Sequence, residues 1–162
     1  MPGTTRAPDA RTPAVPGRTW TVRDLLFGWA ATSSRAADLG LLLLRVITGL
    51  ALAFAHGMGK VPPSAGFVGR VGEMGLPAPG MFAWLAALAE FAGGILLALG
   101  LLTRPAAFLV FGNFVIITLM AHAGDDFGDR EKGVLFGAIA LLYVLAGAGR
   151  YSLDALIHRR PR

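Results

Sequence analysis

Four long runs of apolar residues divide this chain, and each is close to the length that crosses a lipid bilayer. They cover residues 39–57, 81–102, 105–122 and 133–149. A helix rises about 1.5 Å per residue, so roughly 20 apolar residues span a hydrocarbon core of about 30 Å. The pattern predicts an all-α, polytopic membrane protein, with a four-helix transmembrane bundle over residues 39–149.

The segments outside these runs are different in character. Residues 1–19 are rich in Pro, Thr and Arg and cannot bury enough apolar surface to fold, so we expect a disordered basic tail. No short apolar stretch with a cleavage site follows directly, so we expect no cleaved signal peptide. Apolar residues recur at helical spacing within 20–31, which indicates an amphipathic helix at the membrane interface. Residues 150–162 form a second basic tail with another short amphipathic helix, for which Ser152 is the expected N-cap.

The connections between the runs also carry information. Residues 61–80 contain many prolines and glycines, so an irregular or re-entrant loop is predicted there. Residues 103–105 read Thr-Arg-Pro and predict a minimal turn, which makes the second and third helices antiparallel neighbours. Pro105 suits the first turn of the third helix.

The basic residues are distributed unequally between the two sides of the predicted bundle. The opposite side holds only Lys60, Arg70, Arg130 and Lys132, whereas ten arginines lie in the two tails and the second-to-third turn: Arg6, Arg11, Arg18, Arg23, Arg35, Arg104, Arg150, Arg159, Arg160 and Arg162. Because cytoplasmic segments carry the excess of Lys and Arg, both termini are predicted to be cytoplasmic in a bacterial plasma membrane.

Composition narrows the function classes. Of 162 residues, 54% are hydrophobic, which is too apolar for one soluble domain. The formal net charge is +5, but the basic residues flank apolar runs, so the expected partner is the lipid bilayer and not nucleic acid. The chain has no cysteine, which excludes thiolate catalysis and cysteine-ligated iron–sulfur clusters. No metal-ligand spacing occurs, so no metal site is predicted.

One acidic residue stands near the middle of an apolar run. A carboxylate at the depth of Glu90 costs roughly 3 kcal/mol to insert, so it should face the protein interior and have a partner. Arg45 is the expected partner, because the two depths differ by roughly 8 Å, which an extended arginine nearly covers. Gly93 and Gly94 should let a neighbouring helix approach closely. The alternative is a pair that only fixes helix register.

Further polar residues gather toward the predicted outer side. Arg45 and His56 share nearly one helix face, and Lys60 follows one turn later, so we predict an outward-open polar funnel. A quinone headgroup needs hydrogen-bond donors, proton acceptors and an apolar surrounding. The candidate proton relay is Glu90, His56 and Glu131, and the candidate substrate-binding residues are Arg45, Lys60 and His122. The alternative for the residues near helix ends is an interfacial role.

An ordered set of short motifs resembles the DoxX family of small bacterial membrane proteins, over about residues 39–158. No single motif is specific for the family, but the whole set in this order is. The set comprises Arg45, HGMGK at 56–60, GLPAP at 75–79, EFAGG at 90–94, GLLTR at 100–104, His122, Glu131 and GAGRYSLD at 147–154.

That family is similar to the membrane subunit of thiosulfate:quinone oxidoreductase. The resemblance implies a four-helix membrane bundle and a redox role, and the polar residues make a membrane quinone the candidate cofactor. The first hypothesis is therefore a quinone-interacting component of an oxidoreductase system that works with a redox partner protein. The alternatives are a non-catalytic membrane scaffold that recruits soluble proteins and, more weakly, a small-solute or proton carrier. Four short helices shield a polar centre poorly, which favours a homo-oligomer.

Overall fold

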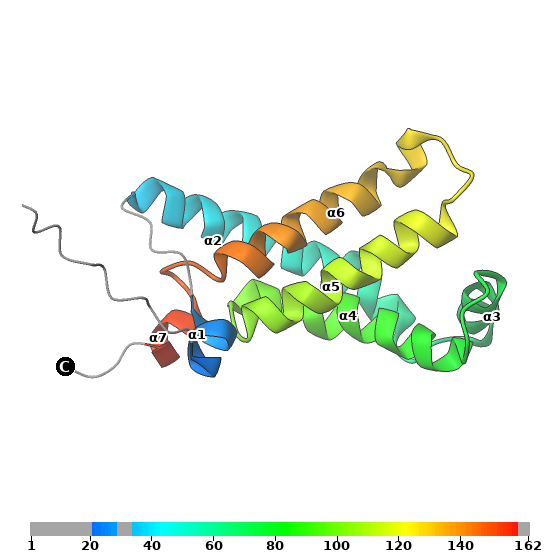
Figure 1. The fold of residues 1–162 in the computed structure, drawn as a ribbon, viewed down its shortest axis with the longest axis horizontal. Helices are drawn as coiled ribbons and strands as arrows, with labels where there is room; N and C mark the ends of the chain where they lie inside the picture. The colour runs from blue at the N-terminus through cyan, green and yellow to red at the C-terminus, as the bar shows by residue number, and fades with distance from the viewer. Residues whose placement is uncertain (1–20, 29–33, 159–162) are drawn as a thin grey trace, which may run out of the picture.

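Every regular element of residues 21–28 and 34–158, the parts of the chain that the computed structural model describes, is a helix (Figure 1). This confirms the all-α prediction. Three helical segments are long and apolar enough to cross a membrane: Arg35–Lys60, Pro79–Leu99 and Thr103–Ala121. The first segment comprises α2 (Arg35–Leu50), the π-helical η1 (Ala51–Gly57) and the 3₁₀ turn η2 (Met58–Lys60). The second segment is α4 (Pro79–Leu99). The third comprises α5 (Thr103–Ile116) and the π-helical η3 (Ile117–Ala121).

The fourth expected span corresponds to α6 (Phe127–Ala146), which is 20 residues long. Its first two turns carry four consecutive charged residues, 129–132, so its apolar part is shorter than that of the other three helices. The structure therefore has three clear membrane-spanning candidates in its described part. Whether α6 also spans stays a prediction.

The long helices lie side by side and alternate in direction (Figure 1). Neighbours along the chain are neighbours in space, since α2 packs on α4, α4 on α5, and α5 on α6. The short helix α3 (Ala65–Glu73) lies at one end of the bundle, and α1 (Val22–Phe27) and α7 (Leu153–His158) lie together at the other (Figure 1). This arrangement gives the bundle two structurally distinct ends.

The prediction of an irregular loop over residues 61–80 was wrong for its central part, which forms α3. The Ser64 hydroxyl caps this helix by accepting from the Phe67 backbone N–H at 3.2 Å. Glycine lowers helix propensity by about 1 kcal/mol per residue, but tertiary packing of an amphipathic face overrides propensity. Here Val71 is buried, and α3 packs against α4.

The turn between α4 and α5 also differs from the prediction. Gly100 adopts a left-handed conformation, φ +66°, and ends α4 at Leu99 instead of residue 102. Thr103 already begins α5, so the expected turn at 103–105 forms its first helical turn, and Pro105 lies there as predicted. The turn itself consists of residues 100–102.

The two short helices at the other end lie close to the predicted positions. α1 falls within the predicted segment 20–31 and packs on α5 and α7, while the tails 1–19 and 159–162 lie outside the described residues. At α7 the expected cap is confirmed, because the Ser152 hydroxyl accepts from the Ala155 N–H at 3.1 Å. Ser152 also donates to the Gly149 carbonyl at 2.8 Å, which fixes the chain before α7.

Glycines bring two helices into backbone contact. A Cβ at Gly49 of α2 would meet the Gly94 carbonyl oxygen at 2.5 Å, and a Cβ at Gly94 would meet the Gly49 oxygen at 2.7 Å. The close approach predicted at Gly94 is therefore confirmed, and Gly49 is its counterpart on α2. Gly93, by contrast, faces Val110 of α5.

Arg45 does not pair with Glu90, contrary to the prediction. Its side chain is 1% exposed, and its two terminal nitrogens donate to the carbonyls of Ala148 at 2.5 Å and Tyr151 at 2.8 Å. These carbonyls belong to the segment between α6 and α7, outside any helix, so they have no intrahelical partners. Arg45 is thus satisfied by backbone acceptors of this segment and does not contact Glu90.

Asp154 forms a second set of contacts between the segment that follows α6 and the rest of the bundle. Its carboxylate accepts from the backbone N–H groups of Leu102 at 2.8 Å and Thr103 at 2.9 Å, at the start of α5, and its own N–H donates to the Gly100 carbonyl at 2.8 Å. A carboxylate at a helix N-terminus satisfies donors that have no intrahelical partner and stabilises the helix dipole. Arg45 and Asp154 therefore fasten the segment after α6 to the rest of the bundle.

Replacing Gly94 by Val should destabilise the bundle by at least about 2 kcal/mol, because the new side chain would collide with the backbone of α2. Gly40 of α2 is the matched control, since a Cβ there meets nothing within 4 Å. Thermal unfolding of both variants in lipid nanodiscs, followed by circular dichroism, measures the difference. Equal melting temperatures for Gly94→Val and Gly40→Val would contradict the close contact.

Replacing Asp154 by Ala should also lower stability, because the N–H groups of Leu102 and Thr103 lose their acceptor at a cost of about 1–3 kcal/mol each. Asp126 precedes α6 and makes no side-chain capping bond, so Asp126→Ala serves as the control. The same unfolding measurement should show a lower melting temperature for Asp154→Ala alone. An unchanged melting temperature in that variant would count against the junction.

Candidate functional site

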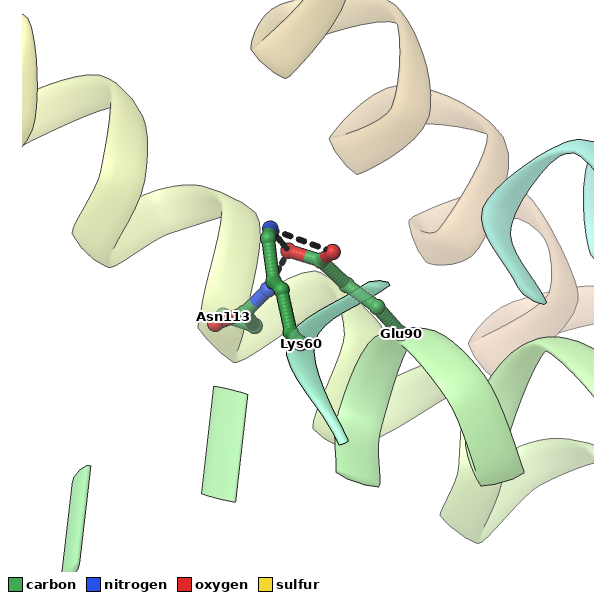
Figure 2. A network of polar contacts seen from close by, with 3 residues as sticks. All are labelled: Lys60, Glu90 and Asn113. Carbon is green, nitrogen blue, oxygen red and sulfur yellow. Dashed lines mark hydrogen bonds and ion pairs between the residues drawn. The ribbon is translucent and has the colours of Figure 1, made fainter. Parts of the chain in front are cut away.

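The side chains of Lys60, Glu90 and Asn113, which come from three helical segments, form one polar cluster (Figure 2). The Lys60 ammonium, at the end of η2, lies 2.7 Å from Glu90 Oε1 and 2.5 Å from Oε2. Asn113 of α5 donates from Nδ2 to the same Oε1 at 3.2 Å. The partner of the buried acid is therefore Lys60, with Asn113 as a second donor.

Burial makes this contact energetically demanding. The Glu90 side chain is 1% exposed, whereas the Lys60 side chain is 30% exposed. Removing a carboxylate from water costs several kcal/mol, which a close cation and further hydrogen bonds offset. Lys60 supplies the opposite charge and Asn113 supplies the additional hydrogen bond, so both compensate the burial of the carboxylate.

A glycine positions Lys60 for this role. A Cβ at Gly57 would collide with the backbone of Glu90 and Phe91, so the end of η1 lies directly on the backbone of α4. The chain then tightens into the 3₁₀ turn Met58–Lys60, which places Lys60 three residues beyond the point of contact. The local sequence Gly-Met-Gly-Lys thus brings an ammonium group to a buried carboxylate.

The helix α3 contributes an aromatic ring beside the ion pair. Lys60 Nζ lies 5.5 Å from the ring centroid of Phe67, and Arg70 Cζ lies 5.8 Å from the same centroid. Both distances fall within the range of cation–π attraction. Phe67 therefore connects α3 to the ion pair.

A cavity of about 560 Å³ opens beside these residues, between α3, α4 and α5. Among the described residues that line it, only Lys60, Glu90 and Asn113 are polar. The remaining wall is formed by aliphatic and aromatic side chains together with small residues of α4 and α5. An apolar cavity of this size with a few convergent polar groups is typical of a small-molecule binding site.

The other predicted site residues do not join this cluster. His56 packs edge-on against Phe136 of α6, with ring centroids 5.3 Å apart, and it does not line the cavity. His122 contacts Asp125 at 2.6 Å through Nδ1, and Glu131 is exposed on α6. Within the described part of the chain, none of these three forms a hydrogen bond or ion pair with Lys60 or Glu90. The single outward funnel predicted from the sequence is therefore not formed.

The helix geometry explains why His56 and Lys60 separate. In a regular α-helix, residues four apart share one face. The chain here is π-helical through Gly57 and then 3₁₀ through Lys60, so the number of residues per turn changes between the two side chains. His56 therefore contacts α6, while Lys60 contacts α4.

Sequence reasoning missed two contributors to the site, Asn113 and Phe67. Asn113 is a lone amide inside the apolar run 105–122, and polar side chains in membrane helices commonly hydrogen-bond across helices. That signal was available in the sequence. The role of Phe67 was hidden because its segment was expected to be irregular.

The polar cluster offers hydrogen-bond donors and acceptors to a ligand in the cavity. Lys60 has three N–H bonds, and Asn113 keeps a carbonyl oxygen that points away from Glu90 (Figure 2). Glu90 is a proton acceptor within a largely apolar wall. In the described residues, no group of three or more His, Asp or Glu side chains is arranged to hold a metal ion.

Two bacterial proteins are similar to this chain over most of its length. "Inner membrane protein YqjF" of Escherichia coli K12 is 29% identical over 127 residues, which cover 76% of this chain and 95% of that protein. "Putative oxidoreductase CatD" of Bacillus subtilis 168 is 31% identical over 128 residues, which cover 78% of this chain and 92% of that protein. No solved structure gives a significant match.

The similarity to an inner membrane protein and the three apolar helices together support a location in a bacterial inner membrane. The sequence profile of the DoxX family matches residues 40–123, a range that includes Lys60, Glu90 and Asn113. This match covers just over half of the chain and agrees with the all-helical membrane fold. The chain therefore belongs to the DoxX family of membrane proteins.

Proposed function

We propose that this protein is a quinone-interacting membrane component of an oxidoreductase system. The observation that carries the proposal is the cluster of Lys60, Glu90 and Asn113 on the wall of an otherwise apolar cavity. The name of the Bacillus subtilis relative, "Putative oxidoreductase CatD", agrees with a redox role. The cavity supplies a place for the ligand, and the cluster supplies its chemistry.

The chemistry of a quinone headgroup is complementary to this cluster. Its carbonyl oxygens accept hydrogen bonds, for which the Lys60 ammonium and the Asn113 amide are donors. Reduction to a quinol adds two protons, and Glu90 is a group that can take up or release a proton beside the ring. The ring and tail are apolar and match the rest of the cavity wall.

A redox partner is part of the proposal. The chain contains no cysteine, so it has no thiol couple or cysteine-ligated cluster of its own to carry electrons. Electrons therefore pass between the quinone and a partner oxidoreductase. On this view the present chain binds the quinone and manages its protons, while the partner supplies or accepts the electrons.

We further propose that both termini are cytoplasmic, because ten arginines lie in the tails and the second-to-third turn. In this orientation α3 and Lys60 lie toward the outer side of the membrane. In that orientation, Lys60 is the member of the ion pair through which we propose that protons exchange with the outer side.

The substitution Glu90→Gln should remove a quinone that co-purifies with the protein, because the amide offers neither the charge that orders Lys60 nor the same proton acceptor. The measurement is mass spectrometry of small molecules extracted from wild type and variant in nanodiscs at equal protein. Glu73→Gln is the control, since Glu73 is exposed at the end of α3 and does not line the cavity. We expect near-stoichiometric quinone in wild type and control, and none in Glu90→Gln.

A double variant separates binding from folding, because Glu90→Gln leaves Lys60 without its charged partner. Replacing Lys60 by Met and Glu90 by Leu removes both charges, and such exchanges are often neutral or stabilising in folded proteins. A folded double variant without quinone would support the site. A folded double variant that retains the quinone, or a wild-type protein that carries none, would refute the proposal and favour a scaffold role.

A further inference from the structure

We propose that the first part of the quinone tail lies inside the protein, in a slot between α4 and α5, and not in the surrounding lipid. This inference rests on the proposed function, since it concerns the ligand of the same cavity. The inference specifies where the tail lies and which way it points. It also identifies the residue whose size determines how much space the tail has.

The cavity is long, and four of its lining residues, Leu85, Leu88, Phe108 and Leu109, are also exposed on the surface of the bundle. Its lining runs from Phe82 to Leu96 along α4 and from Pro105 to Ile117 along α5. At about 1.5 Å per residue these stretches are about 20 Å long. A volume of about 560 Å³ spread over this length is a slot that suits one extended chain better than a compact molecule.

The polar groups divide this slot into two parts. Glu90 and Asn113 lie near its middle, and the outer part is lined by α3, which contributes Phe67 and Val71. The inner part continues for about 10 Å, from Glu90 to Leu96 on α4. Every described residue that lines this inner part is apolar. A ligand with one polar end therefore places its headgroup at the ion pair and its chain along the inner part.

Gly112 stands at the junction of the two parts and has no packing reason to be glycine. A Cβ there would meet nothing within 4 Å, although Gly112 lines the cavity. Glycine inside a helix costs about 1 kcal/mol relative to alanine. Gly93, opposite on α4, already faces the Val110 side chain, with a Cβ contact of 3.1 Å. The open space at Gly112 is thus room that the protein's own side chains leave unfilled, and the tail occupies it.

The test measures the binding affinity of two quinones with the same headgroup, one with a prenyl tail and one without. Each is measured on wild type, Gly112→Leu and Gly40→Leu in nanodiscs. Gly40 is the matched control, because a Cβ there also meets nothing within 4 Å but Gly40 does not line the cavity. Partitioning of each quinone into lipid is the same for all three proteins, so it cancels when variants are compared.

We expect Gly112→Leu to weaken binding of the tailed quinone about tenfold or more while leaving the tail-less quinone within about twofold, and Gly40→Leu to change neither. If Gly112→Leu weakens the binding of both quinones equally, or changes the binding of neither, the tail placement is overturned while quinone binding itself stands. Failure of wild type to bind either quinone would overturn the proposed function and the tail placement with it.

A second measurement uses the wild-type protein and is independent of how Gly112→Leu folds. A quinone with a photoreactive group on the first unit of its tail is cross-linked, and the modified residues are mapped by mass spectrometry. Adducts on Ala92, Gly93 or Leu96 of α4, or on Pro105 or Ala106 of α5, support the slot, because these lining residues are not exposed on the bundle surface. Adducts confined to exposed apolar residues outside the cavity, such as Phe54 or Leu145, place the tail in lipid and overturn the inference.

Discussion

The burial of one carboxylate is the constraint on which the central part of this structure depends. Glu90 is almost fully enclosed within an apolar helix, where an unpaired charge would cost several kcal/mol. Its compensation requires Gly57 to lie against the backbone of α4, the chain to tighten into a 3₁₀ turn, and Lys60 to arrive at the carboxylate. Asn113 then ties α5 to the same point. One charge thus determines how three helical segments meet.

The second buried charge is stabilised by different means. Arg45 donates to two backbone carbonyls beyond the end of α6, and Asp154 accepts from two N–H groups at the start of α5. Asp154 uses a helix N-terminus, where backbone N–H groups lack intrahelical partners and the helix dipole favours a negative charge, whereas Arg45 binds two carbonyls of the segment between α6 and α7. Arg45 therefore holds that segment to α2, while the ion pair of Lys60 and Glu90 borders the cavity. The protein separates its structural charge from the charges available to a ligand.

The sequence predicts those features of the fold and of the site that depend only on distance along a helix. Apolar run lengths give the helices, and the depth of Glu90 marks it as buried, because both follow from distance along a helix. The partner of Glu90 does not follow, since the rule that residues four apart share a face fails where the chain changes from π-helical to 3₁₀ between His56 and Lys60. Likewise, α3 was hidden because its glycines disfavour an isolated helix, and only packing against α4 stabilises it.

The position of the ion pair relative to the cavity has a consequence for how a ligand is held. A membrane already provides an apolar environment, so burying an apolar tail between α4 and α5 gains little from the hydrophobic effect and must rely on packing. The polar contacts of Lys60 and Asn113 are different, because lipid offers the headgroup no equivalent donors. In the proposed binding mode, recognition therefore resides mainly in the polar cluster, and the slot acts by admitting chains of suitable width. Glu90 would serve recognition indirectly, since its carboxylate holds Lys60 and Asn113 together at one point of the cavity wall.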